Sequence, residues 1–501
     1  MSYDRLISDR TDLVRNLRLP TYDTVIKGGR VLDPANKIDT VTDLGINHGR
    51  VEAVSEGLRV SAGGHTIDAS GQWVMPGHID THSHVSSAGD ERNVDRALGL
   101  AMLAESGTTT CLDLLGTPES LSDGIRRLGS GINVAGVMAL IPHLTIPRDD
   151  PPISMMRDIV SDALTRGAIG VKMIGGYHPF TPESTAGVIE SANEQTAWVA
   201  FHLATKDSSS TLEGLREVPE LLGEGRLHVA HINSYCRGMI LSAEEECKEA
   251  LDILGNLRGQ VVTESYLAQM NGTNGLCDED GNVVANVPQN CLVARDYPPT
   301  EVGIRQALLD GYGFAQTVQD GRVILVTGQE AVDIWEAANT AASLSFPVNP
   351  ASSAYTLATA QYEPEQHGFP DDADFRIDAV STDGGAIPRN VAIERTMALV
   401  HFGAMTPLNA VRKLSYNPAV MLGLLNKGHF TDGADADITI VDSQSGLATM
   451  SLVAGEVIMR DRRSVASGGK WIVTSEGEDA AKNSGINYEI IDLQESQLYR
   501  S

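Results

Sequence analysis

The sequence is poor in basic residues and has no long apolar run. It carries 38 lysines and arginines against 66 aspartates and glutamates, a formal net charge of -28 over 501 residues. A field of that sign repels nucleic acid and anionic membranes, so we expect neither as a partner. No stretch reaches the ~20 apolar residues of a membrane helix, and residues 1–24 lack the apolar core of a signal peptide.

Cysteine is also scarce, and its spacing is uninformative for metal binding. The five cysteines are an odd number, and no two of them have the C-x-x-C spacing. A disulfide scaffold is therefore excluded, and a reducing cytoplasm is the expected location. They are Cys111, Cys236, Cys247, Cys277 and Cys291.

The sequence pattern at the two ends of the chain predicts β-structure. Short strands separated by glycine and asparagine run from Tyr22 to Asp68, which is typical of a small β-sandwich. Strand character returns after Gly433 and continues to a last strand at Lys470–Val473. We expect one composite sandwich from residues 22–72 and 425–480, with an N-terminal arm at 1–21 and a C-terminal tail at 481–501.

The middle of the chain, residues 73–424, alternates apolar runs with helical stretches. Such alternation predicts a parallel sheet, and a count of eight runs predicts a closed (β/α)8 barrel, giving an α/β fold class. The runs are Trp73–Ile79, Thr108–Leu115, Val134–Ile141, Ala168–Ile174, Trp198–Leu203, Leu227–Ile232, Gln260–Tyr266 and Ile377–Thr382.

The gap between the last two runs is too long for a plain loop. Residues 267–376 contain turn dipeptides such as Asn271-Gly272 and helical pieces such as Glu301–Leu309. We expect a structured insertion at the mouth of the barrel, which acts as a lid or a specificity element.

The strongest chemical signal follows the first run. His82 and His84 are two residues apart on a strand, so both imidazoles face the same side and can bind one cation. A His-x-His pair is weak support by itself. The position of this pair at the carboxyl end of a barrel strand strengthens the interpretation as a metal site, because barrel active sites lie there.

Four further ligand-type residues end later strands. Each could be a satisfied core polar group, but a lysine inside an apolar strand is costly unless it is paired, modified or functional. Ligand-type residues at five strand ends together predict a metal site. The four are Lys172, His202, His231 and Asp383.

This ordered set resembles the binuclear subtype of the amidohydrolase superfamily, over nearly the whole chain. Val74-Met75-Pro76-Gly77 before the histidine pair and Asn417-Pro418-Ala419 near the end agree with it. The resemblance implies that Lys172 is carbamylated by carbon dioxide and bridges two divalent cations. Zinc is the default metal, manganese, cobalt or nickel would fit the same ligands, and a homo-oligomer, dimer or tetramer, is expected.

The subfamily stays open. Tyr177 follows Lys172 by five residues, as in hydantoinases and dihydropyrimidinases, where that tyrosine stabilises the oxyanion. The short interval from His202 to His231 and the stretch Ser381–Gly384 are closer to D-aminoacylases and isoaspartyl dipeptidases. D-aminoacylases, however, use no bridging lysine here.

The expected reaction is hydrolysis of a C–N amide bond by metal-activated hydroxide. Asp383 would bind one metal and carry the proton of water to the leaving nitrogen, and Tyr177 would donate to the oxyanion. The substrate would be a small molecule, a cyclic amide or imide of the hydantoin or dihydropyrimidine type. The alternative is a linear amide, an N-acyl-D-amino acid or an isoaspartyl dipeptide.

Three more residues are candidates for binding the substrate: Arg389, His143 and Glu264, all near strand ends.

Two other functional classes compete with the amide hydrolase. A deaminase on the same barrel usually needs one metal and no lysine, and a scaffold protein would have lost its ligands. The presence of Lys172 and the full ligand set argue against both.

Overall fold

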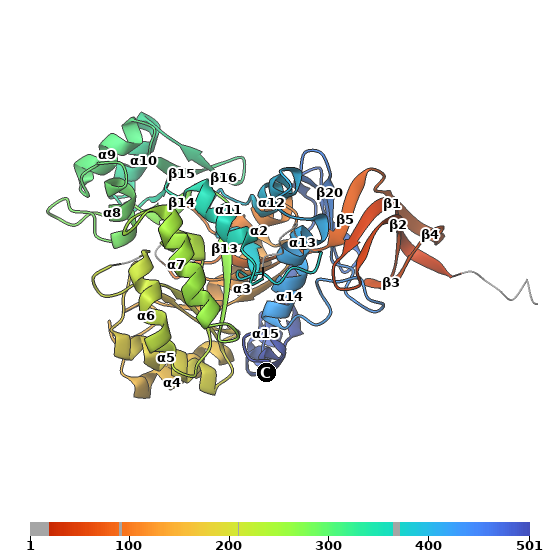
Figure 1. Cartoon of the computed structure of the whole chain (residues 1–501), viewed down its shortest axis with the longest axis horizontal. Helices are drawn as coiled ribbons and strands as arrows, with labels where there is room; N and C mark the ends of the chain where they lie inside the picture. Colours follow the sequence, from red (N-terminus) through yellow and green to blue (C-terminus); the bar gives the residue numbers. More distant parts are fainter. Residues whose placement is uncertain (1–19, 90–92, 209, 364–370, 501) are drawn as a thin grey trace, which may run out of the picture.

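The computed structural model describes residues 20–89, 93–208, 210–363 and 371–500. Three parts are visible in Figure 1: a β-rich part at the right, a barrel in the centre and an insertion at the upper left. The predicted α/β class, with a barrel and a separate β-rich domain from both chain ends, is confirmed.

The β-rich part is one nine-stranded sheet that both chain ends build. Parallel pairing of β1 with β5 and antiparallel pairing of β5 with β20 join the two ends. Ile26, Leu44, Ile438 and Leu452 lie in its shared core. Its strands are β1 (Thr21–Asp33), β2 (Ile38–Asn47), β3 (Arg50–Ser55), β4 (Arg59–Asp68), β5 (Gln72–Pro76), β20 (Ile438–Asp442), β21 (Ala448–Val453), β22 (Glu456–Arg460) and β23 (Arg463–Ser464).

The first apolar run is split between the two domains. We expected one barrel strand at Trp73–Ile79, but β5 ends at Pro76 and β6 (His78–His84) begins after Gly77. A Cβ at position 77 would lie 2.2 Å from Thr109 Oγ1, so only glycine lets the chain pass from one sheet to the other here. The histidine pair is therefore on β6, the first barrel strand.

The barrel is a ring of parallel strands. Two of its eight strands are interrupted: the third is divided into β8 and β9, and the eighth into β18 and β19. The pairing of β19 with β6 closes the ring. The strands after β6 are β7 (Thr108–Asp113), β8 (Ser130–Gly136), β9 (Met138–Leu140), β10 (Gly170–Ile174), β11 (Trp198–His202), β12 (Leu227–Val229), β13 (Val261–Tyr266), β18 (Ala379–Ser381) and β19 (Gly384–Gly385).

Amphipathic helices cover the outside of the barrel. Their apolar residues pack on the strands, as Leu215 on α6 and Ala250 on α7 do. Ser242 and Glu245 form a capping box at the start of α7. The helices are α2 (Leu98–Glu105), α3 (Pro118–Leu128), α4 (Ile153–Thr165), α5 (Pro182–Glu194), α6 (Leu212–Leu222), α7 (Ala243–Asn256), α11 (Ala351–Thr359), α12 (Ala392–His401), α13 (Pro407–Val411) and α14 (Asn417–Leu422).

The insertion has a core of its own, built around Trp335, Leu344 and Phe346. It ends before α11, because α11 packs on α7 and β13 of the barrel. The separate unit is thus shorter than the expected 267–376. Its elements are β14 (Asn271–Asn274), α8 (Asn286–Val293), α9 (Glu301–Leu309), β15 (Phe314–Gln319), β16 (Arg322–Val326), α10 (Gln329–Ala337) and β17 (Ser343–Phe346).

The last strand of the expected sandwich lies elsewhere. β24 (Gly468–Val473) pairs in parallel with β8 and with β25 (Asn487–Ile490), not with the β-rich sheet. The buried Trp471 packs there, and Gly167 leaves room for its ring. Residues 481–500 are therefore ordered against the barrel, with α15 (Glu478–Ser484) before β25. The expected N-terminal arm lies almost wholly outside the described residues.

Within the described part of the chain, no helix combines the length and the apolar character that a membrane crossing requires.

Candidate active site

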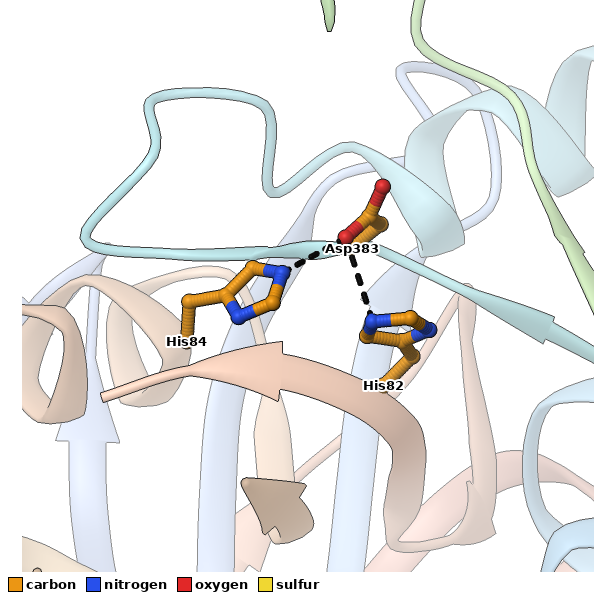
Figure 2. A group of neighbouring side chains, drawn as sticks. All are labelled: His82, His84 and Asp383. Carbon is orange, nitrogen blue, oxygen red and sulfur yellow. Dashed lines mark hydrogen bonds and ion pairs between the residues drawn. The ribbon is translucent and has the colours of Figure 1, made fainter. Parts of the chain in front are cut away.

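The six ligand-type residues come together at one end of the barrel. His82 and His84 lie on β6, Lys172 on β10 and His202 at the end of β11, while His231 and Asp383 follow β12 and β18. The carboxyl ends of parallel strands meet at this rim. Figure 2 shows the two histidines pointing from one strand towards Asp383 on the neighbouring segment.

The nitrogen and oxygen atoms of these side chains face one another at short distances. Asp383 Oδ1 lies 2.8 Å from His84 Nε2 and 3.3 Å from His82 Nε2 (Figure 2). Lys172 Nζ lies 3.1 Å from His82 Nε2. On the other side of the cluster, His202 Nδ1 and His231 Nε2 are 3.2 Å apart.

These separations fit a metal site. Two ligand atoms bound tetrahedrally at ~2.0–2.1 Å from one cation lie about 3.4 Å apart. The side chains of His82, His84 and Asp383 can each place one ligand atom within 4.8 Å of the others. Burial lowers the pKa of His202 to about 3 and that of His231 well below its usual value. The imidazoles are therefore neutral, which is the form that binds metal.

Lys172 is buried in this cluster, with 3% of its surface exposed. Burial lowers its pKa to about 8. Among the described residues it forms no ion pair with a carboxylate within 4.0 Å, and its only hydrogen-bond contact is with His82. A buried ammonium ion is costly, so burial makes the neutral amine of Lys172 accessible near neutral pH.

Asp383 is held by Arg389. Arg389 Nη2 pairs with Asp383 Oδ2 at 2.7 Å, and its Nε donates to the backbone carbonyl of Asp383. Asp383 has a left-handed backbone, with φ of 47°, which turns its Oδ1 towards the histidines. Burial acts to raise the pKa of Asp383, but Arg389 and the histidines hold it well below its usual value.

Glu264 on β13 lies beneath the histidines and is fully buried. Its Oε1 accepts from the His231 backbone N–H at 2.7 Å and lies 2.6 Å from His82 Nδ1, while Oε2 contacts His228 Nε2. Burial acts to raise the pKa of Glu264, yet His228 and His82 bring it down to about 2. As a carboxylate it holds the proton of His82 on Nδ1 and leaves Nε2 free for a metal.

A cavity of about 280 Å³ opens above the cluster. Leu115, Ile141 and Ile174 line one wall of it, next to Tyr177. The insertion lines another part with polar residues, among them Thr273, which accepts a hydrogen bond from the Tyr177 hydroxyl at 3.0 Å. Burial raises the pKa of Tyr177 to about 12, so this hydroxyl keeps its proton.

The comparisons with known proteins agree with this geometry. The amidohydrolase family profile matches residues 370–471. A dihydroorotase of Trichlorobacter lovleyi is 24% identical over 467 residues, covering 85% of this chain and 93% of the relative. The chain is therefore similar to members of the amidohydrolase family.

Solved structures share the fold of this chain. A D-aminoacylase with a binuclear metal centre has a TM-score of 0.61 at 17% identity, covering 89% of this chain and 99% of its own. A D-hydantoinase has a TM-score of 0.54 at 16% identity, covering 94% and 99%. At these identities the likeness shows the fold alone.

The three residues expected to bind substrate are placed differently from one another. Arg389 borders the cavity, but its guanidinium is engaged by Asp383. Glu264 lies below the six ligand-type residues and does not line the cavity. His143 is mostly exposed and faces Asp149 at 3.4 Å, because a turn after β9 directs it away while Ile141 lines the wall.

One residue of the candidate site was not singled out from the sequence. His228 lies on β12, three residues before His231, and supports Glu264 from below. Trp198 Nε1 donates to His228 Nδ1 at 3.2 Å. The sequence does place a second histidine near His231, since His228 lies within the short apolar strand that precedes it. Only the fold shows that His228 faces the barrel interior.

Proposed function

We propose that this protein hydrolyses a C–N bond of a cyclic amide or imide, of the hydantoin or dihydropyrimidine type. One observation carries the proposal: six side chains from five parts of the barrel rim bring their nitrogen and oxygen atoms to 2.8–3.3 Å of a neighbour. That arrangement suits two divalent cations, which would lower the pKa of a shared water towards neutrality.

The residues divide between the two cations. His82, His84 and Asp383 would hold one, and His202 and His231 the other. Lys172 lies between the two groups, where its neutral amine would add to carbon dioxide and release one proton. The resulting carbamate would offer one oxygen to each cation. Zinc is the default, while manganese, cobalt and nickel suit the same nitrogen and oxygen ligands.

The protein's own groups then move the protons. Asp383 accepts the proton of the attacking water and passes it to the leaving nitrogen. Arg389 binds the other carboxylate oxygen, so Asp383 stays oriented through both steps. Tyr177 remains protonated in the cavity wall and donates to the oxygen of the tetrahedral intermediate, a contact typically worth about 3–4 kcal/mol.

A second candidate function is hydrolysis of a linear amide, such as an N-acyl-D-amino acid or an isoaspartyl dipeptide. The similarity in fold to a D-aminoacylase favours it. The presence of Lys172, the position of Tyr177, and the similarity to a dihydroorotase and a D-hydantoinase favour the cyclic substrate.

The test measures metal content and substrate preference in the same preparations. Hydantoins, dihydropyrimidines, cyclic imides, N-acyl-D-amino acids and β-aspartyl dipeptides are offered to the wild type and to Lys172→Ala. We expect about two metals per chain and cleavage of a cyclic member in the wild type. Lys172→Ala should lose metal and activity, with partial rescue by short carboxylic acids that replace the carbamate.

Lys206→Ala is the matched control, because Lys206 forms a surface ion pair with Asp150 away from the cluster. It should keep both metals and full activity. Cleavage of linear amides alone would replace the first proposal by the second. Full metal content in Lys172→Ala would remove the bridging role of this lysine.

A further inference from the structure

The sheet of the insertion has one polar face. In its antiparallel register Asn274 lies opposite Ser343, and Phe314 lies opposite Ser345. Opposite residues share a face, and so do residues two apart on one strand. Asn274, Ser343, Ser345 and Gln316 therefore lie on the same face of the sheet.

This polar face is turned towards the active-site cavity. Asn274, Ser343 and Gln316 line the cavity. The residues between them, Ala315 and Leu344, point to the other side and are buried in the core of the insertion. In β15 and β17 the period of two thus separates a packed face from a face that meets the cavity.

Gln316 is the best placed residue on this face. It is 1% exposed, and its Nε2 donates to Ser345 Oγ at 3.3 Å. Its Oε1 has no hydrogen-bond partner among the described residues. The strand is also fixed, since Asn93 Nδ2 donates to the Gln316 carbonyl at 2.7 Å and Asn93 Oδ1 accepts from the Ser343 N–H at 3.2 Å.

A buried acceptor without a partner destabilises the fold unless a ligand satisfies it. An amide oxygen only accepts, so the ligand must bring an N–H or O–H donor. In the proposed reaction Lys172 and Asp383 act at the scissile amide. The N–H or O–H group that donates to Gln316 Oε1 therefore belongs to a different part of the substrate.

We propose that Gln316 Oε1 accepts a hydrogen bond from a second N–H of the substrate, which makes the substrate class a cyclic ureide with an –NH–CO–NH– unit. This inference rests on the proposed function. It separates ureides such as hydantoin and dihydrouracil from imides such as succinimide and glutarimide, which carry a methylene group in place of that N–H.

The experiment compares these matched pairs of substrates in the wild type and in Gln316→Met. Methionine keeps the length of the side chain and removes the amide. We expect kcat/KM for hydantoin to fall by roughly tenfold or more, while kcat/KM for succinimide changes little. Comparing the variant with the wild type cancels the intrinsic reactivity of each ring.

Gln319→Met is the matched control, because Gln319 lies on the same strand and is exposed. It should leave both values unchanged. Gln316→Ala removes the same amide without filling the space and gives the second measurement if Gln316→Met does not fold. An unchanged ratio of hydantoin to succinimide in a folded Gln316 variant would overturn the inference. Failure of the wild type to cleave any cyclic substrate would instead overturn the proposed function.

Discussion

At the scale of single residues, the site is supported by a carboxylate that does not line the cavity. Glu264 accepts from the His231 backbone, His82 and His228 at once, so one buried group orients two metal-type residues. Behind it, Trp198 fixes His228 through a hydrogen bond at 3.2 Å. Such outer partners tune metal affinity because they set the proton position and the direction of the ligand ring.

We therefore predict that Glu264→Gln weakens metal binding. The amide has one acceptor oxygen where the carboxylate has two, so one of the histidine N–H groups would face another donor. The apparent dissociation constant for the metal, measured by competition with a chelator, should rise by about 10–100-fold.

Glu246→Gln provides the comparison for this substitution. Glu246 on α7 is equally buried and accepts three backbone N–H groups, from Gly238, Ile240 and Leu241. It lies away from the metal-type residues, so its substitution should lower stability and leave metal affinity unchanged. Equal metal affinity in Glu264→Gln and the wild type would show that Glu264 has only a structural role.

The sequence predicted that the six ligand-type residues meet, but it did not predict where their supporting residues lie. The six ligand-type residues could be found because strand ends of a barrel meet at one rim, whatever the details of packing. The direction of a side chain beyond the strand end depends on local turns. For this reason His143 points to solvent and Glu264 points down into the barrel, although both were expected at the cavity.

At the scale of elements, Arg237 ties both ends of the insertion to the barrel. Arg237 follows His231 and lies at the base of the insertion. Its Nε donates to Asn349 Oδ1 at 2.7 Å and its Nη2 to Asn271 Oδ1 at 2.8 Å. Asn271 begins β14 and Asn349 follows β17, so a single side chain holds both ends of the insertion.

Arg237→Ala should loosen the insertion as a unit. Hydrogen bonds from a charged group contribute about 1.5–3 kcal/mol each, so amide exchange in residues 271–346 should quicken by at least about tenfold. The measurement is hydrogen–deuterium exchange followed by mass spectrometry. Arg216→Ala, which removes a surface ion pair with Glu249, should leave this region unchanged. Unaltered exchange in Arg237→Ala would mean that packing and the contacts of Asn93 and Arg322 hold the insertion without it.

The position of the insertion was predictable, but its limits were not. A helical pattern looks the same in an insertion and in a barrel, so α11 was counted with the insertion although it packs on α7 and β13. The placement of β24 could not be predicted from the sequence for a similar reason. Its apolar alternation predicts a strand, but the choice of β8 as its partner depends on long-range packing of Trp471.

At the scale of the whole molecule, a buried cluster of charges joins the β-rich domain to the barrel. Lys427 Nζ lies 2.5 Å from Asp435 Oδ2 and 2.8 Å from Asp437 Oδ2. Asn133 on barrel strand β8 also donates to Asp437, at 2.9 Å. Glu489 on β25 completes the cluster, 3.7 Å from the lysine.

Lys427→Met should therefore destabilise the molecule more than an ordinary surface substitution. Burial acts to lower the pKa of Lys427, but Asp437, Glu489 and Asp435 raise it above its usual value, so the ammonium form is present at neutral pH. Removing the cation leaves the buried Asp437 without a cationic partner, while Asp435 keeps its ion pair with Arg50. Breaking a buried pair in this way typically costs about 3–5 kcal/mol. Lys470→Met, which removes a more exposed partner of Glu489, should cost less than about 1 kcal/mol. Urea unfolding at neutral pH measures both. A loss in Lys427→Met as small as that in Lys470→Met would mean that apolar packing, not this cluster, joins the two domains.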